Sequence, residues 1–262
     1  MVLVPAVLAA VVWAPGWLFA LLLVLLGLQA VREFYGLAEA AGSEPQRLLG
    51  MALTAGVVLA LALPWPVTAR LGVAGAGAAV VAVLLGALCQ PEKMRTSLAS
   101  AGATLLGAAY VGLFLGTLGA IRLQAFGSAW LVFLLLVVWL GDTAALYAGR
   151  AWGGRIWKRP MAPRVSPKKS WEGGLASVAA AALVGLAVAL WQSAPALVAV
   201  AVAVNVAAQL GDLIESLFKR GAAVKDSGRL LPGHGGVLDR IDAMLLAAPV
   251  LWCCLAFFHP LR

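Results

Sequence analysis

Long apolar segments joined by short polar connections constrain this chain more than any other feature. They fall at about 2–14, 16–37, 48–63, 66–88, 102–121, 127–149, 172–191, 194–215 and 241–259. A helix needs about 20 mainly apolar residues to span a bilayer. With 63% hydrophobic and 11% charged residues, the chain is too apolar for a soluble core. The pattern therefore predicts an all-α polytopic membrane helix bundle.

About nine transmembrane helices are expected, and eight remain an alternative. Pro5 and Pro15 interrupt the first apolar segment, which is short for a span. The connections leave no room for a sizeable soluble domain, so residues 1–262 are predicted to form one integral membrane domain. Within it, residues 1–125 would supply N-terminal helices and residues 126–262 the catalytic helices. Arg32 is the first charged side chain, so the N-terminus lacks the basic start of a signal peptide.

The positive charge is concentrated in two connections. Twelve of the nineteen basic residues lie between Arg150 and Lys169 or between Lys219 and Arg240. A hairpin of two apolar segments separates these connections, so both face the same side, and the positive-inside bias places that side in the cytoplasm. The net charge of +8 therefore indicates basic cytoplasmic loops in the cell membrane, and no nucleic-acid partner is expected.

Polar residues recur along one face of the segment 194–215 and just beyond it. Asn205, Gln209, Asp212 and Ser216 are spaced by four, three and four residues, which places them on a single helix face. Asp142 lies near the same end of the segment 127–149. Acids at such depth usually face a bundle interior or a wet cavity. The alternative interpretation is that the polar face only forms hydrogen bonds between helices.

The connection that follows this face carries the densest set of groups able to bind phosphate. Its cations are Lys219, Arg220, Lys225 and Arg229. The sequence PGHGG at residues 232–236 provides backbone that can approach a ligand, and the next helix would offer free N–H groups to phosphate. His234 could also donate a hydrogen bond to phosphate or lie in solvent.

Two acids follow this glycine-rich turn at helical spacing. Asp239 and Asp242 would lie on one face of the first helical turn. With Asp212 they could hold a divalent cation, because Mg²⁺ prefers oxygen ligands shared with substrate phosphates. The alternative is that the acids complement the helix dipole and the neighbouring cations bind anionic lipid head groups.

The other basic connection offers a second anion site. The sequence RVSPKKSWEGG, residues 164–174, contains Ser166, Lys168 and Lys169 before a predicted helix start at Trp171. Lysines beside a membrane can instead act only as determinants of topology.

Gly112 and Gly116 have the GxxxG spacing that lets helices approach closely in lipid.

The segment 216–242, called the signature segment below, resembles the signature of phosphatidate cytidylyltransferases, also called CDP-diacylglycerol synthases. The matching positions are Ser216, Lys219, Arg220, Lys225, Asp226, Gly228, Pro232, His234, Gly235, Gly236, Asp239, Arg240 and Asp242. The resemblance extends to Asn205, GDLIES, SPKKSWEGG and GDTAALYAGRAWG, and in the first half to REFYGLA. Leu146 departs from the family, which usually has a tyrosine there.

The resemblance implies that CTP and phosphatidic acid react to give CDP-diacylglycerol and pyrophosphate at the cytoplasmic face. The lipid phosphate would attack the α-phosphorus of CTP in line, so no protein nucleophile is needed. Magnesium is implied, and participation of a second, monovalent cation is left open. Membrane lipids and a second copy of the chain, in a homodimer, are the further expected partners.

Site roles are assigned on the basis of this resemblance. Asp212 and Asp239 are expected to bind the metal, with Asp242 as a further ligand or close neighbour. Asp212, Asp239, Lys219 and Lys225 form the expected catalytic set. The expected substrate-binding set is Asp142, Ser166, Lys168, Lys169, Ser216, Arg220, His234, Gly235, Gly236 and Arg240.

Two other functions remain possible from the sequence. A CTP-dependent kinase of a polyprenol or another lipid alcohol shares the terminal motif, but it would release CDP in place of pyrophosphate. The match at SPKKSWEG disfavours the kinase. A transporter of anions would place charges deep in several spans, whereas here they gather at one predicted membrane face.

Overall fold

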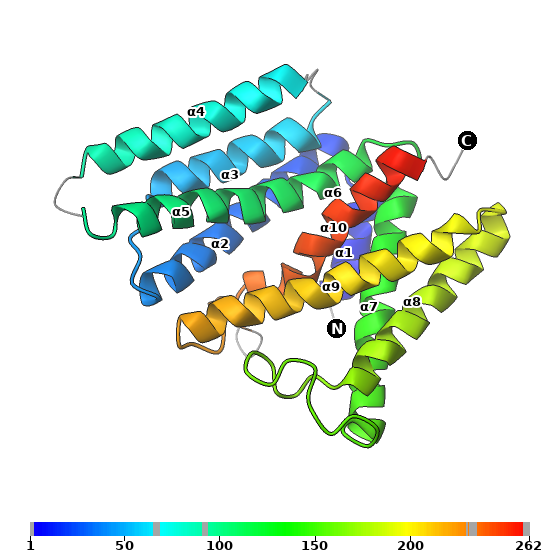
Figure 1. Ribbon diagram of the computed structural model, residues 1–262. Helices are drawn as coiled ribbons and strands as arrows, with labels where there is room; N and C mark the ends of the chain where they lie inside the picture. The colour runs from blue at the N-terminus through cyan, green and yellow to red at the C-terminus, as the bar shows by residue number, and fades with distance from the viewer. Residues whose placement is uncertain (1–2, 65–68, 91–93, 229, 231–234, 259–262) are drawn as a thin grey trace. The chain divides into compact units, whose positions relative to one another are not determined.

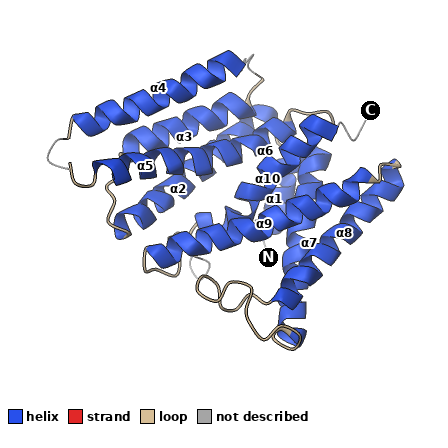
Figure 2. Ribbon diagram, viewed as in Figure 1, coloured by secondary structure: helices blue, strands red, loops and turns tan. Residues whose placement is uncertain are grey.

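The computed structural model describes residues 3–64, 69–90, 94–228, 230 and 235–258. Within these ranges every regular element is a helix, and an isolated β-bridge joins Ala162 and Ser166 in the connection between two helices (Figure 2). The prediction of an all-α polytopic membrane bundle is confirmed. The long apolar segments form helices because, in lipid, the backbone N–H and C=O groups of each segment must form hydrogen bonds within that segment.

Each apolar segment of the sequence corresponds to a helix or a continuous helical stretch (Figure 1). The elements are α1 (Leu3–Trp13), α2 (Gly16–Ala40), α3 (Arg47–Ala62), α4 (Ala69–Leu88), α5 (Ser97–Gly107), the π-helical segment η2 (Ala108–Leu113), α6 (Phe114–Arg122), α7 (Gly127–Trp152), α8 (Trp171–Gln192), α9 (Ala196–Gly221) and α10 (Leu238–Phe258).

Seven helical stretches in the described part of the chain are long and apolar enough to cross a membrane. One of them, Ser97–Arg122, combines α5, η2 and α6. The apolar helices Val4–Trp13 and Arg47–Ala62 are shorter than a typical span. The expected number of eight or nine transmembrane helices therefore stays a prediction.

The chain forms two compact units, each built from segments that are not contiguous in the sequence. Unit 1 comprises Met1–Val12, Phe126–Leu217 and Asp242–Arg262, and unit 2 comprises Trp13–Ala125 and Phe218–Ile241. Most of the signature segment thus packs with the N-terminal helices, although the sequence suggested a catalytic half at 126–262. The assignment of 1–262 to a single domain stays a prediction.

Small residues let the helices of unit 1 approach closely. Helices α7 and α8 lie side by side (Figure 1). A Cβ added at Gly185 of α8 would lie 2.9 Å from the Leu197 carbonyl oxygen of α9, and one added at Gly211 of α9 would lie 2.5 Å from the Asp242 carbonyl oxygen of α10. Glycine is therefore required at both contacts by the neighbouring backbone.

In unit 2, helix α3 packs against α2 and against the stretch formed by η2 and α6. Gly112 faces the backbone of Thr54, and Gly116 faces the side chain of Leu61. Both contacts are with α3 of the same chain. The GxxxG spacing is thus used for packing within this unit, and it gives no support to a homodimer.

An aromatic cluster fixes the end of α9 within unit 2. The ring of Phe34 on α2 lies 5.6 Å from that of Phe218, and the ring of Tyr110 lies 5.8 Å from Phe218, both edge to face. Such pairs stabilise a fold beyond simple burial of their area, by about 0.5–1.5 kcal/mol each. The first residue of the signature segment in this unit is therefore held by α2 and η2.

Candidate functional site

A cavity of about 540 Å³ in unit 1 is the larger candidate site. Helices α7, α8 and α9 and the α7–α8 loop (residues 153–170) enclose it. Its charged or amide-bearing lining residues are Asp142, Arg150, Lys168, Lys169, Gln209 and Asp212. Pockets for small molecules typically measure about 300–1,000 Å³. The cavity can therefore hold a phosphorylated ligand of moderate size.

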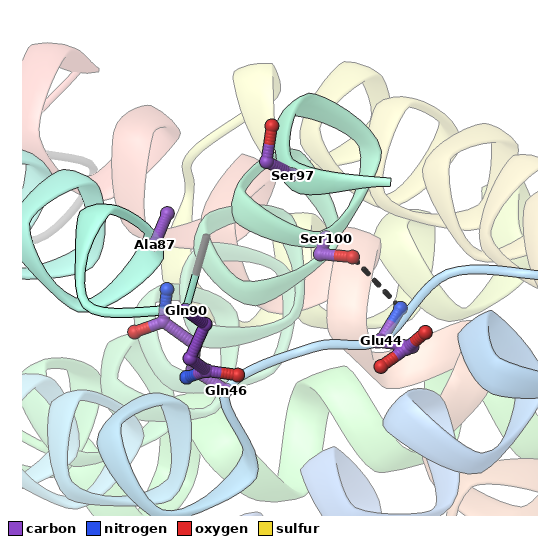
Figure 3. A pocket seen from close by; sticks show the side chains of 6 residues that line it. All are labelled: Glu44, Gln46, Ala87, Gln90, Ser97 and Ser100. Carbon is purple, nitrogen blue, oxygen red and sulfur yellow. Dashed lines mark hydrogen bonds between the residues drawn. The ribbon is translucent and has the colours of Figure 1, made fainter. Parts of the chain in front are cut away.

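A second cavity, in unit 2, is much smaller (Figure 3). It measures about 20 Å³ and lies among Glu44, Gln46 and Ser100, with the Ser100 hydroxyl accepting a hydrogen bond from the Glu44 amide at 2.8 Å. A cavity must have a volume of about 10–15 Å³, measured in the same way, to hold a single water molecule. The small cavity can hold one water but no nucleotide, so the cavity of unit 1 is the candidate ligand site.

The α7–α8 loop and α9 meet in this cavity through an ion pair. Lys169 Nζ lies 2.6 Å from Asp212 Oδ2, and the two side chains are 26% and 39% exposed. The Ser216 hydroxyl donates to Asp212 Oδ1 at 3.3 Å. The cavity therefore contains acidic and basic groups that a polyanion and a cation could share, as the sequence predicted for Asp142, Lys168, Lys169 and Asp212.

The polar face of α9 divides into two parts. Asn205 is buried and exchanges hydrogen bonds with Ser177 of α8, at 3.0 and 3.2 Å. Gln209 donates to Asn205 Oδ1 at 2.8 Å and to the Gly174 carbonyl at 3.2 Å. These two residues join helices, as the alternative interpretation held, and of the two only Gln209 also lines the cavity, together with Asp212.

A buried glutamate that the sequence analysis did not single out orders the α7–α8 loop. Glu172 Oε1 accepts hydrogen bonds from the amides of Ile156 at 2.9 Å and Trp157 at 3.2 Å. The Ser170 hydroxyl accepts from the Gly173 amide at 3.1 Å and caps α8, which begins at Trp171 as predicted. The loop that carries Lys168 and Lys169 is thus tied at both ends to α8.

The central ion pair of the signature segment lies in unit 2. Lys219 Nζ is 2.7 Å from Asp239 Oδ1, and only 13% and 6% of these side chains are exposed. Asp239 Oδ2 accepts from the Ser227 amide at 3.0 Å, the Ser227 hydroxyl at 2.9 Å and the Gly236 amide at 2.8 Å. The carboxylate of Asp239 therefore organises the α9–α10 loop (residues 222–237).

The Val237 and Leu238 amides, where α10 begins, are not the free N–H groups expected from the sequence. The Val237 and Leu238 amides donate to the two carboxylate oxygens of Glu33, at 3.1 and 2.8 Å, and the Gly236 amide donates to Asp239. A buried carboxylate satisfies these donors because an unpaired buried N–H is costly. Binding of substrate by Gly235 and Gly236 stays a prediction.

The other predicted residues of the signature segment lie mostly on the surface. Lys225 and Arg240 are exposed, and Arg220 donates to the Val224 carbonyl at 3.4 Å. Gly235 has a φ of +80°, which favours glycine. Arg229 and His234 lie outside the described residues. Their roles in binding phosphate stay predictions.

Ser166 and Asp242 both make local backbone contacts. The Ser166 amide donates to the Ala162 carbonyl at 2.8 Å, and the Ser166 carbonyl accepts from the Lys169 amide at 3.1 Å, within a turn. Asp242 Oδ1 accepts from the Ala243 amide at 2.8 Å. A direct role of either side chain toward substrate or metal stays a prediction.

The carboxylates of the cavity fit a magnesium ion that substrate phosphates help to bind. Asp142 and Asp212 both line the cavity with Lys169, so carboxylate oxygens, which Mg²⁺ prefers as ligands, lie in the same cavity as the cations able to bind phosphate. In the part of the chain that the structure describes, no three acidic, histidine or cysteine side chains converge as a metal site. The metal roles of Asp212, Asp239 and Asp242 stay predictions.

Glu33, Glu172, Ser227 and Arg150 are the candidate functional residues that the sequence analysis missed. Glu33 and Glu172 lie within the matched motifs REFYGLA and SPKKSWEGG, but no role was assigned to either residue. A stronger signal was present, because each is an acid within or at the edge of an apolar segment, where charge is expensive and needs a specific partner. Arg150 was counted only as the first cation of a basic connection, and Ser227 gave no comparable signal.

The model of the cytidylyltransferase family matches residues 1–258. A phosphatidate cytidylyltransferase of Brucella suis is 36% identical over 250 residues, which cover 94% of this chain and 87% of that protein. A phosphatidate cytidylyltransferase of Staphylococcus epidermidis is 39% identical over 164 residues, 61% of each chain. The chain belongs to the cytidylyltransferase family.

Proposed function

We propose that this protein is a phosphatidate cytidylyltransferase, which transfers the cytidylyl group of CTP to phosphatidic acid. The observation that carries the proposal is the 540 Å³ cavity of unit 1, where basic and acidic side chains converge. Curated relatives named for this activity cover nearly the whole chain. Both substrates are polyanions in this reaction, so charge and positioning are the main barriers.

The reaction needs no nucleophile from the protein. An oxygen of the lipid phosphate forms a bond to the α-phosphorus of CTP while the bond to the β-phosphate bridging oxygen breaks, and pyrophosphate leaves. Lys168, Lys169 and Arg150 line the cavity and would bind phosphate oxygens there. Lys169 would exchange Asp212 for a phosphate when substrate arrives, because its present ion pair is partly exposed.

Magnesium is the cofactor that the carboxylates favour. Asp212 of α9 would hold it, and Asp142 of α7 lines the same cavity. Bound there, it would neutralise charge on the phosphates during transfer. Asp239 and Asp242 are retained as proposed contributors to metal binding from the family resemblance.

Orientation and assembly complete the proposal. The basic α7–α8 loop supports a cytoplasmic location for the cavity in the cell membrane, since basic loops are retained on that side. A homodimer is proposed from the family resemblance alone, and native mass spectrometry of the purified protein would test it.

The activity is tested with purified protein, labelled CTP, phosphatidic acid and magnesium in mixed micelles. CDP-diacylglycerol and pyrophosphate should appear together in equal amounts, and chelation of magnesium should stop both. A lipid-alcohol kinase would instead release CDP and phosphorylate an added polyprenol. Failure to form any CDP-lipid would refute the proposal.

Variants then assign the site. Asp212→Asn and Asp239→Asn should each abolish turnover while the protein stays folded in detergent. Arg155→Gln is the matched control, because Arg155 is an exposed basic residue of the α7–α8 loop outside the cavity lining. Near-normal turnover in Asp212→Asn would remove Asp212 from the proposed metal site.

A further inference from the structure

Glu33 of α2 is a buried acid whose partners lie far away in the sequence but within unit 2. The residue is buried, with 6% of its surface exposed. Oε1 accepts from Gln29 Nε2 at 2.8 Å and from the Val237 amide at 3.1 Å. Oε2 accepts from the Leu238 amide at 2.8 Å and lies 3.2 Å from the Ser227 hydroxyl, whose single proton it shares with Asp239 Oδ2. Both oxygens are therefore engaged, and four donor groups surround them.

Three of these four donors belong to the α9–α10 loop or to the first residue of α10. The positive end of the α10 dipole compensates the charge of a buried carboxylate placed there. Glu33 thereby fixes the point at which the loop ends and the helix begins. Asp239 follows Leu238 directly, so its carboxylate is oriented by the helical turn that Glu33 caps.

Ser227 connects Glu33 to Asp239 directly. Its hydroxyl lies within hydrogen-bond distance of Glu33 Oε2, at 3.2 Å, and of Asp239 Oδ2, at 2.9 Å. The Ser227 amide also donates to Asp239 Oδ2 at 3.0 Å. Two carboxylates from different helices are thus held by one loop residue.

The loop fits around Glu33 because glycine occupies two positions beside the carboxylate. A Cβ added at Gly228 would lie 2.7 Å from Glu33 Oε1. A Cβ added at Gly236 would collide with Glu33 Oε2 and lie 2.5 Å from the Ser227 hydroxyl oxygen. The glycines of the signature segment therefore admit a protein carboxylate at these points.

The residue next to Glu33 supports the other member of the Lys219–Asp239 pair. Phe34 packs edge to face against Phe218, with ring centroids 5.6 Å apart, and Lys219 follows Phe218. Adjacent residues of α2 thus hold the end of α9 through Phe34 and the start of α10 through Glu33. These are the two helix ends that the ion pair joins.

We propose that Glu33 is a positioning residue that sets the geometry of Lys219 and Asp239 for cytidylyl transfer. The proposal rests on the proposed function. Glu33 itself touches no substrate in this scheme and acts through the α10 amides and Ser227. A small displacement of reacting groups can reduce a rate by about a hundredfold, so the effect should be on turnover more than on stability.

The central test is Glu33→Gln, which keeps the size but turns one oxygen into a donor that faces other donors. We expect kcat to fall at least about tenfold with KM for CTP changed less than twofold, and Glu33→Asp to recover part of kcat. Gln29→Ala is the matched control. It removes the donor on α2 but leaves the three loop bonds, so kcat should stay within about twofold of the wild-type value.

Hydrogen exchange gives a readout that does not need activity. The Val237 and Leu238 amides should exchange at least about tenfold faster in Glu33→Gln than in the wild type, while amides of α3 are unchanged. This arm still tests the positioning contact if the wild-type protein makes no CDP-lipid, in which case only the proposed function fails. Unchanged exchange at both amides would overturn the positioning role.

Two further outcomes decide the proposal. A folded Glu33→Gln protein with wild-type kcat, or with only a lower melting temperature, overturns it. Where Glu33→Gln does not fold, Ser227→Ala replaces it, because this change removes the hydroxyl that lies between Glu33 and Asp239 without altering α2. Ser227→Ala should lower kcat at least about fivefold, and a wild-type kcat in that variant overturns the proposal.

Discussion

Lys169 Nζ lies 2.6 Å from Asp212 Oδ2, and this ion pair joins the α7–α8 loop to α9 across the wall of the unit 1 cavity. Both side chains are partly exposed, at 26% and 39%. Partly exposed pairs contribute about 0–1 kcal/mol to stability. The pair is therefore weak enough for an incoming phosphate to replace Asp212 as the partner of Lys169.

Lys169→Ala is expected to affect catalysis without affecting the fold. Turnover should fall by at least about tenfold, because a charge-assisted contact to phosphate is lost. The melting temperature in detergent should change by less than about 3 °C, as expected for the loss of an exposed pair. Arg155→Ala, in the same loop, is the control for net charge. Equal losses of activity in the two variants would contradict a specific role of Lys169.

The Lys219–Asp239 pair should behave in the opposite way toward stability. Its side chains are 13% and 6% exposed, and loss of one partner leaves the other charge buried, which costs about 3–5 kcal/mol. Lys219→Met should therefore lower the melting temperature clearly more than Lys169→Met does. The double variant Lys219→Met with Asp239→Asn should recover part of the loss. If the double variant is no more stable than Lys219→Met, the unpaired charge of Asp239 is not what lowers the melting temperature of Lys219→Met.

The sequence was sufficient to predict the helices, because hydrophobic length alone decides them in lipid. It also placed Asp142, Lys168, Lys169 and Asp212 in one site, and all four line the cavity. The family resemblance and the shared membrane side of the two basic connections carried that prediction. The division of the α9 polar face between Asn205 and Asp212 followed only from the structure, since both residues have the same spacing.

Contacts across long sequence separations were beyond prediction. Glu33 and Leu238 are 205 positions apart and form a hydrogen bond, and no local pattern indicates which buried acid will cap which helix. The amides of the glycine-rich turn were consequently assigned to phosphate, when carboxylates of the protein already accept from those at 236–238. The packing of residues 218–241 with N-terminal helices was hidden for the same reason.

Glu172→Ala should release the α7–α8 loop. The Ile156 and Trp157 amides would lose their acceptor. Trypsin should then cleave the released loop more readily at the exposed basic residues beside them. We expect cleavage between residues 155 and 159 at least about fivefold faster than in the wild type, with lower turnover. Glu39→Gln, on the surface at the end of α2, is the control. An unchanged cleavage rate would show that Glu172 does not anchor the loop.

Two glycines of the signature region should respond differently to the same added methyl group. A Cβ at Gly236 would collide with Glu33 and lie 2.5 Å from Ser227 Oγ, whereas nothing lies within 4 Å of one at Gly221. Gly236→Ala should therefore lose most turnover, because Glu33 or Ser227 must move and Asp239 moves with them. Gly221→Ala, at the end of α9, should retain at least about half of the wild-type turnover, since alanine is favoured in helices. Comparable activity in the two variants, each corrected for folded protein, would mean that the contact between Gly236 and Glu33 does not set the geometry of Asp239.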